Sequence, residues 1–172
     1  MSDFTPAALG RPEPGFYDAA AAAWLGAWAG RELGAFEAVC APEVTYEGPV
    51  TDGVLRGPRT LAAHAHALWL AFPDLSLEAG GDVLERGLLC AVPWVAGGTQ
   101  RGEFAGVPAT RRRLQLRGID CLELAGGRVL RARSFFDLHD AAVQLGVLPA
   151  RGTVSERALL TLRGFGLRLR GG

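Results

Sequence analysis

The chain of 172 residues contains no lysine and no asparagine, so every basic side chain other than histidine is an arginine. Without lysine there is no amine for Schiff-base chemistry and no phosphate loop of the lysine-dependent type. Without asparagine there is no asparagine side chain to orient a catalytic base. Net charge is also absent, because 18 acidic residues balance 18 basic ones. This balance argues against a nucleic-acid-binding protein, which normally carries an excess of basic residues.

Cysteines and long apolar runs are scarce as well. Cys40, Cys90 and Cys121 are odd in number and widely spaced, which argues against a disulfide framework or a zinc site. The N-terminus lacks the basic flank of a secretory signal, and the apolar run at residues 18–30 is too short to cross a bilayer. We therefore expect a cytoplasmic protein without metal or cofactor that binds neither nucleic acid nor membrane.

What the chain does contain is apolar residues, at 49% of the sequence, and their spacing changes along it. Helical spacing predicts helices over residues 15–30, 31–40 and 58–72, with Pro42 ending the second. A first strand is predicted over residues 43–48. After Phe72 apolar residues tend to recur at every second position. This period predicts strands over residues 74–80, 87–100, 112–124 and 128–137. Gly126-Gly127 predicts a hairpin between the last two strands, and a short helix or turn follows over 137–149.

Helices followed by antiparallel strands predict an α+β fold with the helices packed on one face of the sheet. The chain is long enough for one domain with a proper core, and no internal repeat divides it. Three prolines mark residues 1–15 as a flexible leader. The domain is therefore predicted over residues 16–149, and residues 150–172, which differ in character, are predicted to be a C-terminal extension.

Five motifs occur in a fixed order within this pattern. They are AFPDL at residues 71–75, GTQRGEFAGVPAT at 98–110, RGID at 117–120, GGRV at 126–129 and FFDLHDAAVQLGVLP at 135–149. Together they resemble the SnoaL-like polyketide cyclase family of the nuclear transport factor-like superfamily, over residues 17–149. The resemblance implies a cone-shaped α+β barrel, in which a curved, mostly antiparallel sheet wraps around the N-terminal helices and encloses an apolar pocket. It also implies a homodimer or a larger homo-oligomer.

The chain departs from the family pattern at several positions near the implied pocket. Gln100 replaces the histidine of the Gly-Thr-His motif, and Ala109 and Arg111 alter the Pro-Pro-Thr-Gly motif. The aspartate that serves as the base in antibiotic ring cyclases aligns with Ser134, and the cyclase histidine aligns with Asp120. The resemblance therefore implies that the pocket is kept while the groups that carry the ring-closing chemistry differ.

Asp120 is the first candidate for catalysis. It shares the period-two face of a predicted strand with Leu114, Leu116 and Leu122, so its carboxylate projects from an apolar wall. A carboxylate in such a place has a raised pKa or a bonded partner, and either condition suits a general base. The alternative is a structural ion pair with a neighbouring arginine.

His64 and Tyr46 are the other candidates for catalysis. His64 lies on the helix face that carries Leu61 and Leu68 and therefore points inward, whereas His66 points elsewhere. An inward histidine near a carboxylate makes a plausible acid–base pair, although a core histidine bonded to a carbonyl is the alternative. Tyr46 falls where the resembling cyclases line their pocket. With Asp120 as base, His64 and Tyr46 would polarise or protonate a carbonyl oxygen.

A further set of residues is predicted to contact the substrate, either as an aromatic wall or as polar lining. These residues are Trp28, Trp69, Trp94, Ser134, Phe136 and Gln100. Core packing is the alternative for the tryptophans. Ser134 has no evident histidine partner, which favours a lining role over that of a nucleophile. Asp137 is predicted to cap the turn that follows it.

These residues predict an enzyme that cyclises or isomerises a polyketide-like or cyclic carbonyl compound by acid–base chemistry in an apolar pocket. A non-catalytic small-molecule binding protein is one alternative, favoured by Ser134 and opposed by Asp120. A second alternative is an epoxide-hydrolase-like enzyme of the same superfamily. In that reading Arg101 and Glu103 align with the Arg-x-Asp pair that activates water, but the final aspartate again falls at Ser134.

Overall fold

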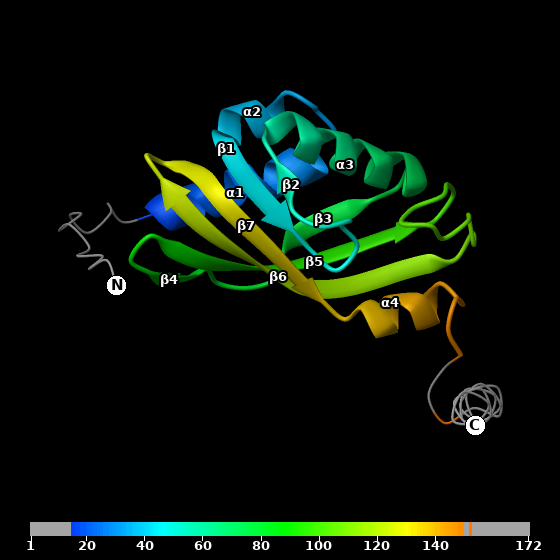
Figure 1. Ribbon diagram of the computed structural model, residues 1–172. Coiled ribbons are helices and arrows are strands. Elements are labelled where there is room, and N and C mark those ends of the chain that lie inside the picture. Colours follow the sequence, from blue (N-terminus) through cyan, green and yellow to red (C-terminus); the bar gives the residue numbers. More distant parts are fainter. Residues whose placement is uncertain (1–14, 150–151, 153–172) are drawn as a thin grey trace, which may run out of the picture.

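A curved, open sheet dominates the computed structural model, which describes residues 15–149 and Gly152 (Figure 1). Its strands follow the order β2-β1-β7-β6-β5-β3, and β4 pairs with β5 outside this path. The strands are β1 (Cys40–Glu47), β2 (Leu55–Arg56), β3 (Ser76–Ala79), β4 (Leu84–Arg86), β5 (Leu89–Thr99), β6 (Arg113–Ala125) and β7 (Arg128–Phe136). The pair β1–β7 is parallel and the other pairs are antiparallel. The mostly antiparallel α+β fold predicted from the sequence is confirmed, with a sheet that does not close into a complete barrel.

Helices α1 (Phe16–Ala29), α2 (Ala35–Val39) and α3 (Pro58–Ala71) lie together over one face of the sheet, whereas α4 (Leu138–Gln144) follows β7 at one end of it (Figure 1). The alanine-rich sequence of α1 has a high intrinsic helix propensity. Helix α3 begins at Pro58, whose fixed φ suits a first helical position. It ends just before Phe72, which precedes a proline and is therefore disfavoured in helical geometry.

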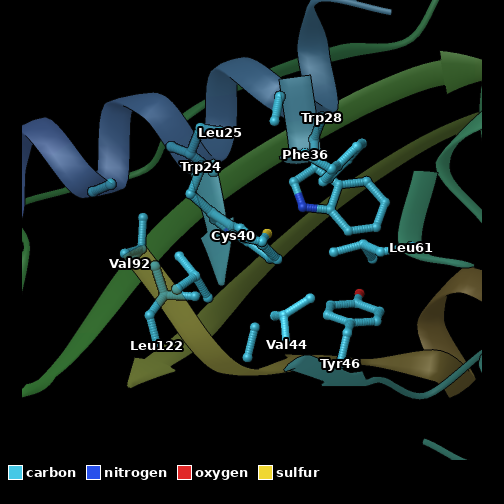
Figure 2. Close-up of a cluster of buried hydrophobic side chains, with 14 of the residues drawn as sticks. Trp24, Leu25, Trp28, Phe36, Cys40, Val44, Tyr46, Leu61, Val92 and Leu122 are labelled. Carbon is cyan, nitrogen blue, oxygen red and sulfur yellow. The ribbon is translucent and has the colours of Figure 1, made fainter. Parts of the chain in front are cut away.

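The core fills the space between α1 and the sheet. Trp24 and Trp28, four residues apart on α1, are both buried, as their helical spacing predicted. Figure 2 shows them with Phe36 above Val44 and Tyr46 of β1. Burying a large apolar side chain of this kind stabilises the fold by about 1.5–3 kcal/mol. The same packing brings α1 close to the centre of the sheet, where the candidate site lies.

Three details differ from the sequence-based predictions. The second helix is limited to Ala35–Val39, since Arg31 has a φ of 59° and cannot belong to a right-handed helix. Strand β1 begins at Cys40 and includes Pro42, where the register with β7 shifts and the missing proline N–H breaks no regular ladder. The short strands β2 and β4 occur in segments without a clear period-two pattern.

The ends of the predicted domain lie at the limit of the described residues. Helix α1 begins at Phe16, next to the predicted start of the domain. The leader and the C-terminal extension fall almost wholly outside residues 15–149, so both stay predictions. Within the described residues, no helix is both long and apolar enough to cross a membrane.

Candidate functional site

A cavity of about 580 Å³ opens between the inner face of the sheet and the segments that cover it. Strands β5, β6 and β7 supply one wall, α3 a second, and the loop at residues 104–107 and α4 complete the enclosure. Most of the lining is aliphatic or aromatic, and the polar side chains that reach it include Tyr46, His64 and Ser134. Such a cavity, largely apolar with a few convergent polar groups, is typical of small-molecule sites.

Strand pairing places the polar groups of this wall. Asp120 of β6 pairs with Ser134 of β7, and on its other side with Val92 of β5. One step along the same inner face, Trp94 of β5 and Phe136 of β7 flank Gly118 of β6. Because side chains alternate across a sheet, residues paired in this way project to the same face.

Asp120 is held by two indole groups. The Trp24 indole donates a hydrogen bond from Nε1 to Oδ2 of Asp120 at 2.7 Å, and Trp94 Nε1 donates to Oδ1 at 2.8 Å. The side chain of Ser134 lies opposite the same carboxyl group on the neighbouring strand and lowers its pKa. Asp120 is only 5% exposed, and within residues 15–149 no arginine forms an ion pair with it. The structure therefore contradicts the ion-pair alternative.

The pKa of Asp120 is raised from its ordinary value. Burial is the main cause, because a charged carboxylate loses its hydration, while the hydrogen bonds from Trp24, Ser134 and Trp94 act in the opposite direction. Asp120 itself does not line the cavity, although Trp94 and Ser134 do. The predicted role as a base that touches the substrate directly therefore lacks the required contact. Ser134 and Trp94 come between the carboxyl group and the cavity.

Tyr46 links this buried carboxyl group to the cavity. Its side chain lines the cavity and lies beside the side chain of Ser134, which lowers the Tyr46 pKa. Burial and the nearby charge of Asp120 raise the pKa of Tyr46, so its hydroxyl stays protonated and able to donate. Gly48 leaves room for this contact, since a Cβ there would lie 3.2 Å from Tyr46 Oη and 3.3 Å from Ser134 Cβ. Asp120, Ser134 and Tyr46 form a continuous chain of polar side chains from the buried carboxyl group to the cavity.

His64 faces Tyr46 rather than Asp120. Its ring lies 6.1 Å from the Tyr46 ring, 6.3 Å from Trp28 and 5.6 Å from Phe104, measured between centroids. Burial lowers the pKa of His64, so the imidazole is neutral near neutral pH. Within the described residues it forms no hydrogen bond to a carbonyl or carboxylate, unlike a core histidine held in place by the fold. The expected His64–Asp120 pair is therefore replaced by His64 beside Tyr46.

Of the predicted aromatic wall, Trp28, Trp94 and Phe136 line the cavity, and Trp69 does not. Trp69 Nε1 donates a 2.7 Å hydrogen bond to the main-chain oxygen of Trp28, which fastens α3 to α1. The Trp28 indole packs edge-on against Trp24 and Phe36, and its N–H has no hydrogen-bond partner in the described part of the chain. Trp69 therefore has a packing role, which is the alternative given above for the tryptophans.

Gln100 also lies outside the cavity wall, for a structural reason. Its side chain is fully buried, donates from Nε2 to the Val107 oxygen at 3.0 Å and accepts at Oε1 from Thr110 Oγ1 at 2.8 Å. Its main chain pairs with Arg111 and Arg112. Gln100 thus closes the base of the loop whose residues Phe104, Ala105 and Val107 reach the cavity.

Arg101 and Glu103, the Arg-x-Glu pair of the epoxide-hydrolase alternative, belong to the same loop. Arg101 and Glu103 are both exposed, and neither lines the cavity. The main-chain N–H groups of Arg101 and Gly102 instead donate to the oxygen of Ala71 at the end of α3. Arg101 and Glu103 therefore do not form a water-activating pair in the cavity, which removes the geometric basis of the epoxide-hydrolase alternative.

Sequence reasoning assigned no role at the site to Trp24 or to the short helix or turn predicted over residues 137–149, which is α4. Trp24 was recognised as a core residue by its spacing, but its partner Asp120 is 96 positions away and no local pattern connects them. Helix α4 lines the cavity with Leu138, Ala141 and Ala142. Asp137 caps this helix by accepting from the Asp140 N–H at 2.8 Å, as predicted.

Gln144 fastens α4 beside the sheet. Its Nε2 donates to the Gln115 main-chain oxygen at 2.8 Å, and its Oε1 accepts from the Gln115 N–H at 2.8 Å. These are the two bonds that another strand residue would make, at a point where β7 has already ended. One side-chain amide therefore extends the sheet and holds α4 beside the cavity.

Other chemistries find little support in the described residues. No group of three or more His, Cys, Asp or Glu side chains within them is placed to hold a metal ion. Burial raises the pKa of Cys40 to about 12 and that of Cys90 to about 11, which leaves both thiols protonated and poor as nucleophiles.

Comparison with solved structures finds the same fold in small bacterial proteins. TsrD from Streptomyces laurentii is 24% identical, with a TM-score of 0.71 over 80% of this chain and 100% of that one. A SnoaL-like polyketide cyclase from Jannaschia sp. CCS1, described as putative, is 19% identical, with a TM-score of 0.71 over 82% and 100% of the two chains. IdmH from Streptomyces antibioticus, also described as a putative polyketide cyclase, is 23% identical, with a TM-score of 0.64 over 75% and 97%.

Comparison with curated proteins finds no match to the chain. The sequence profile of one family, described as SnoaL-like polyketide cyclase, matches residues 18–145. The match includes all the strands and the residues of the Asp120–Ser134–Tyr46 chain. The chain therefore belongs to the SnoaL-like polyketide cyclase family.

Proposed function

We propose that the protein is a cofactor-independent enzyme that cyclises or isomerises a polyketide-like or cyclic carbonyl compound in the apolar cavity. The observation that carries this proposal is that Tyr46, Ser134 and His64 all line the same cavity, with Asp120 buried beside Ser134. Membership of a family described as polyketide cyclases supports the reaction class.

Tyr46 is the group that binds the carbonyl oxygen. Its raised pKa keeps the hydroxyl protonated, so it donates a hydrogen bond to the oxygen and strengthens that bond as negative charge develops there. A donor in an apolar cavity stabilises such charge more than water does, because the surroundings have a low dielectric constant. The enolate formed from the substrate is stabilised at this position.

His64 is the group that accepts the proton from the carbon next to the carbonyl. Its lowered pKa keeps the ring neutral, and its nitrogens have no hydrogen-bond partner within the described residues. After this transfer the carbon proton is on His64 and the negative charge is on the substrate oxygen, which accepts a hydrogen bond from Tyr46. In an isomerisation His64 returns the proton to another carbon. In a cyclisation the enolate carbon attacks a second carbonyl group, and the new alkoxide takes the proton from His64.

A binding protein without catalysis is the second candidate function. It is favoured by the position of Asp120, which lies behind the cavity wall, and by Ser134, which aligns with the base of the ring cyclases. Such a protein would bind the same class of ligand through Trp28, Trp94 and Phe136 and leave it unchanged.

Proton exchange at carbon distinguishes the two functions. Cyclic ketones with acidic C–H groups are incubated with the protein in D₂O, and deuterium uptake next to the carbonyl is followed by NMR. Faster uptake with the wild type and loss of that rate in His64→Gln support the enzyme. His66→Gln is the matched control, because His66 lies on the same helix, is exposed and does not line the cavity. Saturable binding without accelerated exchange would support the binding protein instead.

A further inference from the structure

Gly118 determines where the Trp94 indole lies. The two residues face each other across β5 and β6, and a Cβ added to Gly118 would overlap Cζ2 of the indole. The ring therefore occupies the space that a side chain at position 118 would fill. From there Trp94 reaches one pairing step along β6 to Asp120 and contacts Phe136 of β7 at 6.0 Å between ring centroids.

Trp24 reaches the same carboxyl group from a different layer of the fold. It projects from α1, is completely buried, and its N–H donates to Oδ2, whereas the N–H of Trp94 on β5 donates to Oδ1. Each oxygen of Asp120 thus has its own indole donor. An indole N–H can only donate a hydrogen bond, so Asp120 is the acceptor in both bonds.

We propose that Trp24, Trp94 and Gly118 form a clamp that holds the Asp120 carboxyl group in one orientation and directs it toward Ser134. Trp24 and Trp94 are positioning residues in this clamp, because they act on Asp120. Gly118 provides the space that lets Trp94 reach it. The link from Asp120 through Ser134 to the substrate-binding Tyr46 rests on the proposed function, but the clamp itself rests on the contacts alone.

Packing alone does not account for this arrangement. A buried carboxyl group without a cationic partner is costly, and an apolar side chain in its place would avoid that cost. The indoles satisfy the carboxyl oxygens without neutralising the group, so it keeps its ability to gain and lose a proton. Tyr46 is the titratable group that interacts with Asp120 within the described residues, and its hydroxyl stays protonated.

The clamp also sets one wall of the cavity. Trp94 lines the cavity with Phe136 beside it, so a side chain at position 118 would displace the indole from the sheet surface. Substitution of Gly118 should therefore change two properties together: the bond to Asp120 and the space available to a ligand.

The indole N–H signals of the full-length ¹⁵N-labelled protein test the clamp directly. The chain has 4 tryptophans, so single Trp→Phe variants assign every signal. We expect the Trp24 and Trp94 signals to move with pH at one shared midpoint, and both to lose this response in Asp120→Asn. The Trp28 and Trp69 signals should not share it. In Trp28→Phe, the matched control, the midpoint of the other two should be unchanged, because the Trp28 N–H bonds no described residue.

Two variants separate the clamp from ordinary packing. In Gly118→Ala the Trp94 signal should lose its shared pH response while the Trp24 signal keeps one. In Trp94→Phe, which keeps an aromatic ring, the midpoint reported by Trp24 should move to higher pH because one bond to the charged form is lost. Separate midpoints for Trp24 and Trp94 in the wild type, or an unchanged midpoint in Trp94→Phe, would overturn the clamp.

Deuterium exchange measured on the same samples distinguishes this proposal from the proposed function. A shared midpoint without accelerated exchange supports the clamp and counts against the enzyme. Accelerated exchange without a shared midpoint overturns the clamp and leaves the enzyme standing.

Discussion

Ser134 lies directly opposite Asp120 on the neighbouring strand, and its side chain lowers the pKa of both that carboxyl group and the Tyr46 hydroxyl. A carboxylate on a cavity wall would meet the substrate directly and would be open to the cavity. Here a hydroxyl lines the cavity and the acidic group is buried beside it. In the proposed chemistry Asp120 therefore acts on the substrate indirectly, through Ser134 and Tyr46.

Removing the Tyr46 hydroxyl should abolish most of the activity. In Tyr46→Phe we expect the rate of deuterium exchange to fall by roughly 100- to 1000-fold, the usual loss when one donor to a developing oxyanion is deleted. Tyr17→Phe is the matched control, since the hydroxyl of Tyr17 bonds the main-chain oxygen of Gly87 and the residue does not line the cavity. Equal rates in Tyr46→Phe and the wild type would remove Tyr46 from the mechanism.

The pH dependence of the reaction should report His64. Its folded pKa is lowered from 6.5, so the neutral form that accepts a proton is lost only as pH falls through this lower value. We expect kcat/KM to decrease on acidification with a midpoint below 6.5. Because the pKa of His64 is lower in the folded protein than in the unfolded one, its contribution to the free energy of unfolding falls as pH drops below the unfolded pKa. An unchanged acid limb of the pH profile in His66→Gln, together with its loss in His64→Gln, identifies the group.

Asp120 should give the fold the opposite dependence on pH. The pKa of Asp120 is raised above 3.8 in the folded protein. Between pH 3.8 and this raised pKa, the native state therefore binds more protons than the unfolded state does. The contribution of Asp120 to the free energy of unfolding is therefore present at low pH and decreases as pH rises through the raised pKa. Denaturant unfolding at several pH values, compared between the wild type and Asp120→Asn, measures this difference. A difference between the two proteins that does not change with pH would contradict the raised pKa.

Ser134→Asp should couple two carboxyl groups. The new side chain would face Asp120 across the strands, and two such groups at contact distance cannot both ionise easily. We expect the variant to hold one shared proton to higher pH than the wild type, and to lose stability as that proton leaves. Ser134→Ala, which interrupts the chain without adding charge, is the comparison. Titration of the carboxyl carbons by NMR checks the shared proton, and two independent carboxyl groups would contradict it.

Gln144→Ala should loosen α4 without unfolding the sheet. It removes both bonds to the main chain of Gln115, at a cost of about 1 kcal/mol at an exposed site. We expect faster hydrogen exchange in residues 138–144 and weaker ligand binding, because α4 lines the cavity. Gln115→Ala is the control, since only the main chain of Gln115 takes part in these bonds. Equal exchange in the two variants would show that Gln144 does not hold the helix.

We propose that the protein is a homodimer or a larger homo-oligomer, as the family resemblance implies. Light scattering of the purified protein tests this proposal. A single mass at a multiple of the monomer mass of 18.1 kDa would support it, and a mass of 18.1 kDa would contradict it.

Local pattern alone determined much of this protein. The change from helical to period-two spacing predicted the α+β class, and the alternation along β6 placed Asp120 on the inner, apolar face. The helical spacing of Trp24 and Trp28 predicted their burial. The family resemblance, which adds information from many chains, predicted that a pocket lies against this face.

Only the tertiary structure decided what each buried group touches. The alternation of side chains along a strand shows to which face each one points. How deeply Asp120 is buried depends on Ser134 and Trp94, which come from two other strands. Trp69 and Gln100 were expected in the cavity, and each instead donates to the main-chain oxygen of a residue that lines it. The Trp24–Asp120 bond joins residues 96 positions apart, and its geometry exists only once α1 packs on the assembled sheet. Sequence periodicity is a local property, whereas contacts between layers depend on how separate elements pack together.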